Sequence, residues 1–282
     1  MPGDQVARKL LGAWYTPPEL VEITVAGLLD GWSPPPTASG HGVRVLDPAC
    51  GDGRFLAAVE HTIRDRFPST AVELTGVDVD PAAVDTLSRQ LPHARAVHAD
   101  ALTHDWAGAT FDLVVGNPPY LSQMAAATSR GGASRHGGGP YADAAVEFLA
   151  LSVRLADPDG GRVALVLPQS LLGARDAAPV RVQIARQADL AWSWWSPKQQ
   201  HFDAAVNVCV LAFRRPATGA TTAHAFTEVV TARLGIPHLD AARLAVDGTL
   251  GDRAELNANF RDEYYALVPA VSDHADGPPL VT

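Results

Sequence analysis

The strongest constraint on the fold is a glycine-rich turn between a predicted strand and a predicted helix. It lies in residues 43–67, VRVLDPACGDGRFLAAVEHTIRDRF, where a short apolar run is followed by two glycines and then by apolar residues at helical spacing. Glycines at such a point allow the backbone to approach a ligand, and the free N–H groups of the helix then face that ligand. The turn therefore predicts an α/β fold with a ligand at the end of this strand.

The segments that follow repeat the pattern of a short apolar strand ending in polar residues. Residues 43–67 and 74–91 are each predicted as a strand, a turn and a helix, and residues 12–32 as a loop and a helix. Further strands are predicted in residues 95–103, 111–120 and 162–172, a strand pair in 201–215, and an amphipathic helix in 142–161. The run 162–172 is predicted as a buried strand that leads into a loop. Strands that alternate with helices predict a parallel sheet whose ligand lies at the carboxyl ends of the strands.

Composition argues against several classes of protein. The two cysteines, Cys50 and Cys209, are far apart, and no CxxC pair or HExxH motif occurs, which argues against a disulfide framework, a zinc site and a metalloprotease. No window reaches the roughly 18 to 20 uninterrupted apolar residues of a membrane span, so we expect a cytoplasmic protein without a membrane or metal partner. The net charge of −9, with Lys9 and Lys198 the only lysines, does not favour nucleic-acid binding through bulk electrostatics.

The acidic residues near the glycines indicate the kind of ligand. The spacing is not GxGxxG, and Asp47 and Asp52 would repel a pyrophosphate, so an adenosine ligand with a positively charged amino-acid end fits better than a dinucleotide. Asp78 ends the second strand, where a carboxylate can accept hydrogen bonds from ribose hydroxyls. Asp100, after the third strand, can accept one from an adenine amine. The alternatives are a solvated turn at Asp78 and a helix cap at Asp100, and Asp80 is predicted to cap the next helix.

The most informative tetrapeptide is Asn117-Pro118-Pro119-Tyr120, which directly follows a buried strand. Two prolines leave an extended turn with few conformers, so the Asn117 side chain and the Pro118 carbonyl are presented rigidly. These two acceptors can hold the hydrogens of an aromatic amine and direct its lone pair towards an electrophilic methyl group. Tyr120 can stack on the base. A proline turn beside a core tyrosine is the alternative.

Taken in order, these motifs resemble those of the DNA methyltransferases that methylate the exocyclic amine of adenine, in the subgroup whose cofactor motifs precede the catalytic motif. The similarity covers residues 12–215, and the matching segments are GAWYTP, DPACGDG, GVDVD, HADAL, GNPPY, RVALVLPQSLL and HFDAAVNVCVLAF. It implies the class I S-adenosylmethionine-dependent methyltransferase fold, a Rossmann-like α/β fold whose mostly parallel seven-stranded sheet has helices on both faces.

The resemblance also implies an activity and a set of site residues. The activity is adenine-specific methylation of double-stranded DNA with S-adenosylmethionine, in restriction-modification or phage defence, after the target base has been flipped out. Thr16 and Pro17 are implied near the methionine carboxylate, and Phe202 is implied against the flipped base opposite Tyr120, with His201 as its alternative. The other residues implied beside the cofactor are Tyr15, Asp47, Pro48, Ala49, Gly51, Asp78, Val79, Asp100, Ala101 and Asn117.

Two features depart from the family pattern. Asp52 stands where the family more often has a small hydroxyl residue, which puts the strength of cofactor binding in question. Too few residues follow Arg215 for the target-recognition domain that the subgroup carries. We therefore expect a catalytic domain in residues 1–216 and the start of a C-terminal region in 217–282, in a chain that is truncated or needs a specificity subunit.

Other functions stay open at this point. A protein glutamine methyltransferase also uses an NPPY turn, although little chain precedes the glycine turn for a substrate domain, and methylation of an RNA base is chemically equivalent. A non-catalytic subunit of a defence system is a third alternative. The glycine-rich residues 122–141 are predicted to form a surface loop that either contacts DNA or is passive.

Overall fold

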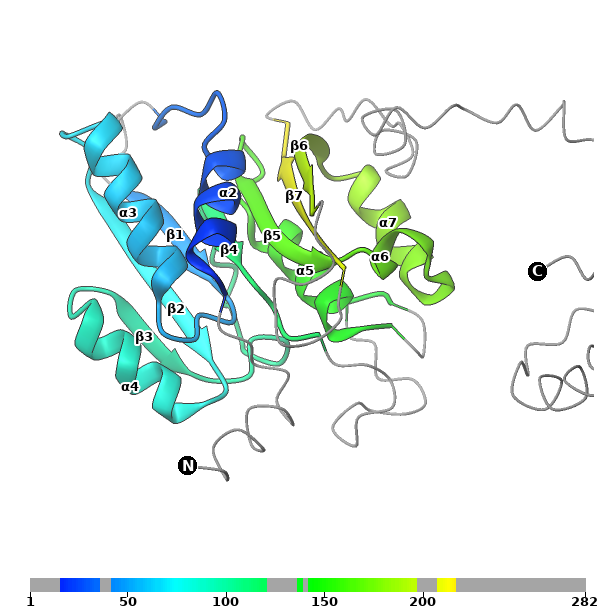
Figure 1. Ribbon diagram of the computed structural model, residues 1–282, viewed down its shortest axis with the longest axis horizontal. Helices are drawn as coiled ribbons and strands as arrows, with labels where there is room; N and C mark the ends of the chain where they lie inside the picture. The colour runs from blue at the N-terminus through cyan, green and yellow to red at the C-terminus, as the bar shows by residue number, and fades with distance from the viewer. Residues whose placement is uncertain (1–15, 36–41, 121–135, 139–141, 197–206, 217–282) are drawn as a thin grey trace, which may run out of the picture. The chain divides into compact units, whose positions relative to one another are not determined.

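The computed structural model describes residues 16–35, 42–120, 136–138, 142–196 and 207–216, and all of these belong to one compact unit of the chain. They form a sheet with helices on both of its faces (Figure 1). None of the helices in these residues is both long enough and apolar enough to cross a membrane.

The sheet has seven strands in the order β3-β2-β1-β4-β5-β7-β6. All neighbouring strands are parallel except β7, which runs antiparallel to both β5 and β6. The strands are β1 (Val43–Asp47), β2 (Val72–Asp78), β3 (Arg95–His98), β4 (Leu113–Gly116), β5 (Arg162–Pro168), β6 (Asp189–Trp195) and β7 (Val208–Arg214). The prediction of a mostly parallel seven-stranded sheet is confirmed.

The helices divide between the two faces of the sheet. Three pack on one face: α2 (Pro18–Leu28), α3 (Arg54–Arg66) and α4 (Pro81–Gln90). Two pack on the other: α5 (Ala144–Leu155) and α7 (Ala178–Ala185). The short helix α6 (Ser170–Gly173) and the 3-10 turn η2 (Arg175–Ala177) connect β5 to α7. Helices on both faces cover the sheet, so its central strands can be apolar on both sides.

Local sequence explains where several helices begin. α2 and α4 start at a proline, which the first helical turn tolerates because its N–H groups have no partner within the helix. Asp80 caps α4 by accepting a hydrogen bond from the N–H of Ala82, as predicted, and Asp143 caps α5 in the same way through the N–H of Ala145.

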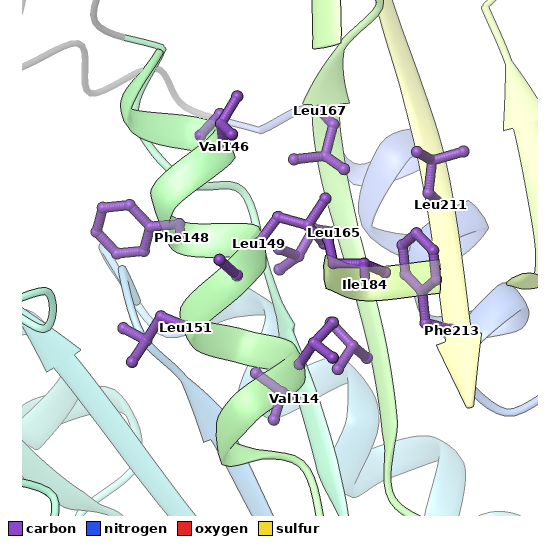
Figure 2. Close-up of a cluster of buried hydrophobic side chains, with 14 of the residues drawn as sticks. Val114, Val146, Phe148, Leu149, Leu151, Leu165, Leu167, Ile184, Leu211 and Phe213 are labelled. Atoms are coloured by element: carbon purple, nitrogen blue, oxygen red, sulfur yellow. The ribbon is translucent and has the colours of Figure 1, made fainter. Parts of the chain in front are cut away.

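The core on the α5 side is made mainly of aliphatic side chains from three neighbouring strands. Figure 2 shows Val114 of β4, Leu165 and Leu167 of β5, and Leu211 and Phe213 of β7, with side chains of α5 packed against them. β4 and β5 are buried along almost their whole length, as expected for strands covered on both faces.

The order of the strands creates a place for a ligand. β1 and β4 are neighbours, but the chain leaves them in opposite directions along the sheet, β1 towards β2 and β4 towards β5. In open α/β sheets such a reversal leaves a crevice outside the carboxyl ends of the two strands. Here β1 ends at Asp47 and β4 ends at Gly116, and Asn117 directly follows Gly116.

Two predictions about the last third of the described chain were wrong. Residues 201–215 were predicted as a strand pair, but their described part, 207–215, holds β7 alone, and its edge partner β6 lies upstream. β6 was missed because it is an edge strand of partly exposed residues, including Trp192 and Trp194, without an alternating pattern. The end of the run 162–172, predicted as a loop, begins the short helix α6, and the sequence analysis made no prediction for η2 and α7, which follow it. α7 buries little besides Val180 and Ile184, so its helical periodicity is weak.

Candidate cofactor and amine site

Asp47 lies at the centre of the carboxyl edge and is completely buried. Its Oδ1 accepts a hydrogen bond from the N–H of Ala49 at 3.1 Å, whereas its buried Oδ2 has no hydrogen-bond partner among the residues that the structure describes. The backbone of Gly116 packs closely on this carboxylate, since a Cβ built on Gly116 would lie 2.6 Å from Oδ1. A larger residue at position 116 would therefore displace Asp47.

The glycine turn wraps around the end of β1. Gly51 and Gly53 have φ angles of +51° and +83°, in the left-handed region that favours glycine, and Gly53 is the residue before α3. A Cβ built on Gly51 would meet no atom of the described part of the chain within 4 Å, so these residues leave the space above Gly51 open. The turn is thus shaped for a ligand to approach its backbone, as predicted from the motif.

Asp78 joins the turn to the end of β2. Its Oδ2 accepts a hydrogen bond from the N–H of Gly51 at 2.8 Å, and its Oδ1 accepts one from the N–H of Asp80 at 2.9 Å. A carboxylate has about four acceptor positions, so lone pairs remain on both oxygens. Asp78 therefore holds the turn in place and can still accept hydrogen bonds from a ligand.

The carboxyl groups of Asp47 and Asp78 make this edge acidic, whereas Asp52 is paired with Arg54. Burial raises the pKa of Asp47 well above its usual range, and the charges of Asp78 and Asp52 raise it further. Burial also raises the pKa of Asp78. Burial works in the same direction at Asp52, but hydrogen bonds and the charge of Arg54 outweigh it and lower the pKa of that carboxyl. A cationic ligand would stabilise the ionised forms of Asp47 and Asp78.

The residues predicted beside an adenine ring lie at the ends of β2 and β3. Val79 is 54% exposed, an unusual exposure for a large apolar side chain, and Ala101 is buried. Asp100 accepts a hydrogen bond from the N–H of Leu102 at 3.0 Å and so closes a turn, rather than capping a helix as its alternative reading held. Asp100 keeps further lone pairs. Its predicted contact with adenine stays a prediction.

The predicted catalytic turn follows β4. The Nδ2 of Asn117 donates a hydrogen bond to the Oγ1 of Thr16 at 2.9 Å, and the Tyr120 hydroxyl donates one to the Oδ1 of Asn117 at 2.6 Å. Burial raises the pKa of Tyr120 well above its usual range, so this phenol remains a hydrogen-bond donor at neutral pH. Pro118 is buried, which restricts the turn further. Asn117 is thereby held at both ends of its amide.

Most of the residues predicted for the site lie along the same edge of the sheet. Thr16 contacts Asn117, and Gly51 contacts Asp78. Asp47 lies between these two pairs, against the backbone of Gly116. Tyr15, His201 and Phe202 lie outside the described residues, as do most of residues 122–141 and all of 217–282. In the described chain, no group of three or more His, Cys, Asp or Glu side chains is arranged to hold a metal ion.

Sequence reasoning missed one contributor to this edge. Arg54 pairs with Asp52 at 2.6 Å and also donates a hydrogen bond to the carbonyl oxygen of Thr16. The signal available in the sequence was the spacing of Asp52 and Arg54, two residues apart across the start of a predicted helix. The contact with Thr16 had no local signal, because 38 positions separate the two residues.

Comparisons with known proteins agree with this arrangement. The model of a family described as N-6 DNA methylase matches residues 4–231. A type II methyltransferase of Thermus thermophilus is 32% identical over 196 residues, which cover 63% of this chain and 39% of that protein. The chain spans less than half the length of the curated relatives that it matches, 39% and 45% for two of them.

Solved structures resemble the fold at lower identity. A protein of Listeria monocytogenes described as a class I S-adenosylmethionine-dependent methyltransferase has a TM-score of 0.54 and 18% identity, and the match covers 77% of this chain and 67% of that one. The methyltransferase subunit of a type I restriction-modification system from Streptococcus thermophilus has a TM-score of 0.55 and 20% identity, covering 70% of this chain and 43% of that one. The fold is that of the class I methyltransferases.

Proposed function

The chain belongs to the N-6 DNA methylase family, and on this premise we propose that it transfers a methyl group from S-adenosylmethionine to the exocyclic amine of adenine in DNA. The proposal rests on the position of Asn117, which Thr16 and Tyr120 hold by hydrogen bonds. The preceding residue, Gly116, packs its backbone on the carboxylate of Asp47, where the glycine turn begins. A hydrogen-bond acceptor for an amine thus lies next to a site suited to a cationic ligand.

S-adenosylmethionine is the cofactor of this family and fold. It supplies an electrophilic methyl group on a positively charged sulfur and also carries an ammonium group. The described residues fit it, because Asp47 offers a buried oxygen without a hydrogen-bond partner and the space at Gly51 is open. We assign Asp78 to the ribose hydroxyls, Val79 and Ala101 to the adenine ring, and Thr16 and Pro17 to the methionine end.

The amine is activated by position rather than by a strong base. Asn117 Oδ1 and the Pro118 carbonyl accept the two amine hydrogens, which helps to localise the nitrogen lone pair in the direction of the methyl group. The Asn117 oxygen already accepts a hydrogen bond from Tyr120, but an amide oxygen has two lone pairs and can accept a second donor. We propose that Tyr120 keeps this bond while its ring stacks on the base.

Adenine within a duplex cannot reach this edge, so the target base must be flipped out at a cost of a few kcal/mol. We propose that Phe202 or His201 contacts the flipped base. Because the chain spans less than half of its relatives, we also propose that contacts to the bases of the recognition sequence come from another segment or from a specificity subunit.

Transfer of a radiolabelled methyl group from S-adenosylmethionine to bacterial DNA, RNA and protein tests the proposal. It is measured with this chain and with the longest reading frame that contains it. Label on the N6 position of DNA adenine supports the proposal. Label on protein glutamine or on RNA would contradict it, and cofactor binding without transfer to any of the three would indicate a non-catalytic subunit.

Replacing Asp78 with alanine is expected to weaken cofactor binding about 10- to 100-fold, because hydrogen bonds to a charged group contribute about 1.5 to 3 kcal/mol. Calorimetric titration with S-adenosylmethionine measures the effect. Asp80→Ala is the matched control, since Asp80 lies two residues away and caps α4. It should lower stability slightly without a comparable loss of affinity. Equal affinities of the wild type and Asp78→Ala would refute the ribose assignment.

Cofactor affinity is expected to fall with decreasing pH. The pKa values of Asp47 and Asp78 are raised above the ordinary 3.8, and the cation stabilises their ionised forms, so binding is strongest above the raised values and is lost as pH falls through them. Each group contributes at most about a tenfold increase in Kd per pH unit. Titrations between about pH 8 and pH 5 measure this dependence. A pH-independent Kd over that range would show that neither carboxyl ionises in the binding step.

A further inference from the structure

Arg54, the first residue of α3, makes contacts that the proposed reaction does not use. Its Nε donates a hydrogen bond to Asp52 Oδ1 at 2.9 Å and its Nη2 donates one to Asp52 Oδ2 at 2.6 Å. This is the bidentate geometry in which a guanidinium binds a carboxylate most firmly. The remaining Nη1 donates to the carbonyl oxygen of Thr16. Arg54 therefore fastens the segment before α2 to the glycine turn.

Thr16 passes this constraint on to Asn117. Thr16 is only 5% exposed, and its Oγ1 accepts the hydrogen bond from Asn117 Nδ2. It lies before α2, whose N-cap Pro17 makes no side-chain capping hydrogen bond. Within the described residues, Thr16 has two polar contacts. Arg54 donates a hydrogen bond to its carbonyl oxygen, and Asn117 donates one to its hydroxyl oxygen. We call the series Asp52–Arg54–Thr16–Asn117 the Arg54 link.

We infer that Arg54 is a positioning residue for Asn117 and acts through Thr16. The inference rests on the proposed function, in which Asn117 Oδ1 accepts a hydrogen of the target amine. The reacting groups must be aligned within a fraction of an ångström. Methyl transfer is therefore faster when the acceptor that orients the amine is held from both sides than when it can rotate. Tyr120 holds the oxygen end of the Asn117 amide, and the Arg54 link holds the nitrogen end.

The link also gives Asp52 a structural role. Asp52 is partly buried and directs its carboxylate to Arg54, and its pKa is lowered by that contact against the effect of burial. Its charge is therefore neutralised within the turn. Lysine could not replace Arg54, because a single ammonium group cannot form the paired contact with Asp52 and also reach Thr16 in the same geometry.

The side-chain amide of Asn117 reports on the link without any need for catalysis. The chain has four asparagines, Asn117, Asn207, Asn257 and Asn259, so selective ¹⁵N-asparagine labelling gives few side-chain signals, and the variant Asn117→Ala assigns the relevant one. In Arg54→Ala, and in Arg54→Lys should the first variant fold poorly, we expect the Asn117 amide signals to shift and broaden. The matched control is Arg64→Ala, which removes an ion pair with Glu60 from the same helix.

Methyl transfer supplies the second readout. In both Arg54 variants kcat is expected to fall about 10- to 100-fold, the size of effect that a small misplacement produces. Cofactor affinity should fall far less than kcat, because Asp47 and Asp78 keep their contacts with the glycine turn in both variants. Arg64→Ala should match the wild type in both respects.

The outcomes separate the inference from the proposed function. Unchanged Asn117 amide signals in folded Arg54 variants would overturn the inference, as would a kcat equal to that of the wild type. Loss of cofactor affinity in proportion to kcat would also overturn it, since Arg54 would then be part of the cofactor site. A wild-type chain that methylates no DNA would contradict the proposed function, and the amide signals would still decide whether Arg54 positions Asn117.

Discussion

Asn117→Ala is expected to lower the rate of methyl transfer at saturating cofactor by about 10² to 10³-fold, the usual loss when one preorganised hydrogen-bonding group of a transition state is removed. The substitution deletes the acceptor for the amine and also the partner of Thr16 and Tyr120. The contacts of Asp47 and Asp78 with the glycine turn do not involve Asn117, so the Kd for S-adenosylmethionine should change by less than about threefold.

Single-turnover transfer of labelled methyl groups to DNA and calorimetric titration with cofactor measure the two quantities separately. Asn117→Asp is the conservative comparison, because it keeps an acceptor oxygen but loses the donor to Thr16. It should retain more activity than Asn117→Ala. A transfer rate in Asn117→Ala close to that of the wild type would remove Asn117 from the reaction, whatever the cofactor affinity.

The parts of the fold that sequence predicted are those with strong local patterns. The glycine turn after Asp47 and the polar residues at the ends of the following strands indicated a parallel sheet, and the sheet confirms this. Asp80 was predicted as a helix cap because it directly precedes a proline and a helical segment. β6 has no comparable pattern, since at the edge of the sheet neither of its faces is consistently buried. Its place depends on β7, which follows it in the chain.

The candidate site was predictable to the level of motifs but not of contacts. Asp78 could be placed at a strand end, yet its hydrogen bond to Gly51 joins residues 27 positions apart and depends on β1 and β2 being neighbours. The contact between Thr16 and Asn117 spans 101 positions and requires α2 to pack over the sheet. Long-range polar contacts of this kind leave no periodic signal in a single sequence.

Asp47→Asn is expected to stabilise the protein without cofactor while impairing its proposed function. Asp47 is fully buried and its Oδ2 has no partner, so its pKa is raised in the folded state. A carboxyl with a raised folded-state pKa favours folding below its unfolded-state pKa, and this contribution is lost as pH rises through the folded value. At neutral pH and above, ionised Asp47 therefore lowers the free energy of unfolding of the wild type, and a neutral amide would reduce this loss.

Relief of about 1 to 2 kcal/mol would raise the Tm by roughly 2 to 6 °C, and the gain should grow with increasing pH. Thermal unfolding of both proteins at several pH values measures it. Asp157→Asn is the control of opposite sign, because hydrogen bonds from the N–H of Asp159 and from Arg44 outweigh burial and lower the Asp157 pKa. That substitution should lower the Tm at neutral pH.

S-adenosylmethionine should raise the Tm of Asp47→Asn much less than that of the wild type. A ligand that binds only the folded state stabilises it in proportion to the logarithm of the ligand concentration divided by Kd, and the variant is expected to have a higher Kd. The buried oxygen that destabilises the protein alone would then be the one that receives the ammonium group. A lower Tm of Asp47→Asn at alkaline pH, or an undiminished cofactor-induced rise, would show that Asp47 is a structural residue of the glycine turn and that the cation binds elsewhere on this edge.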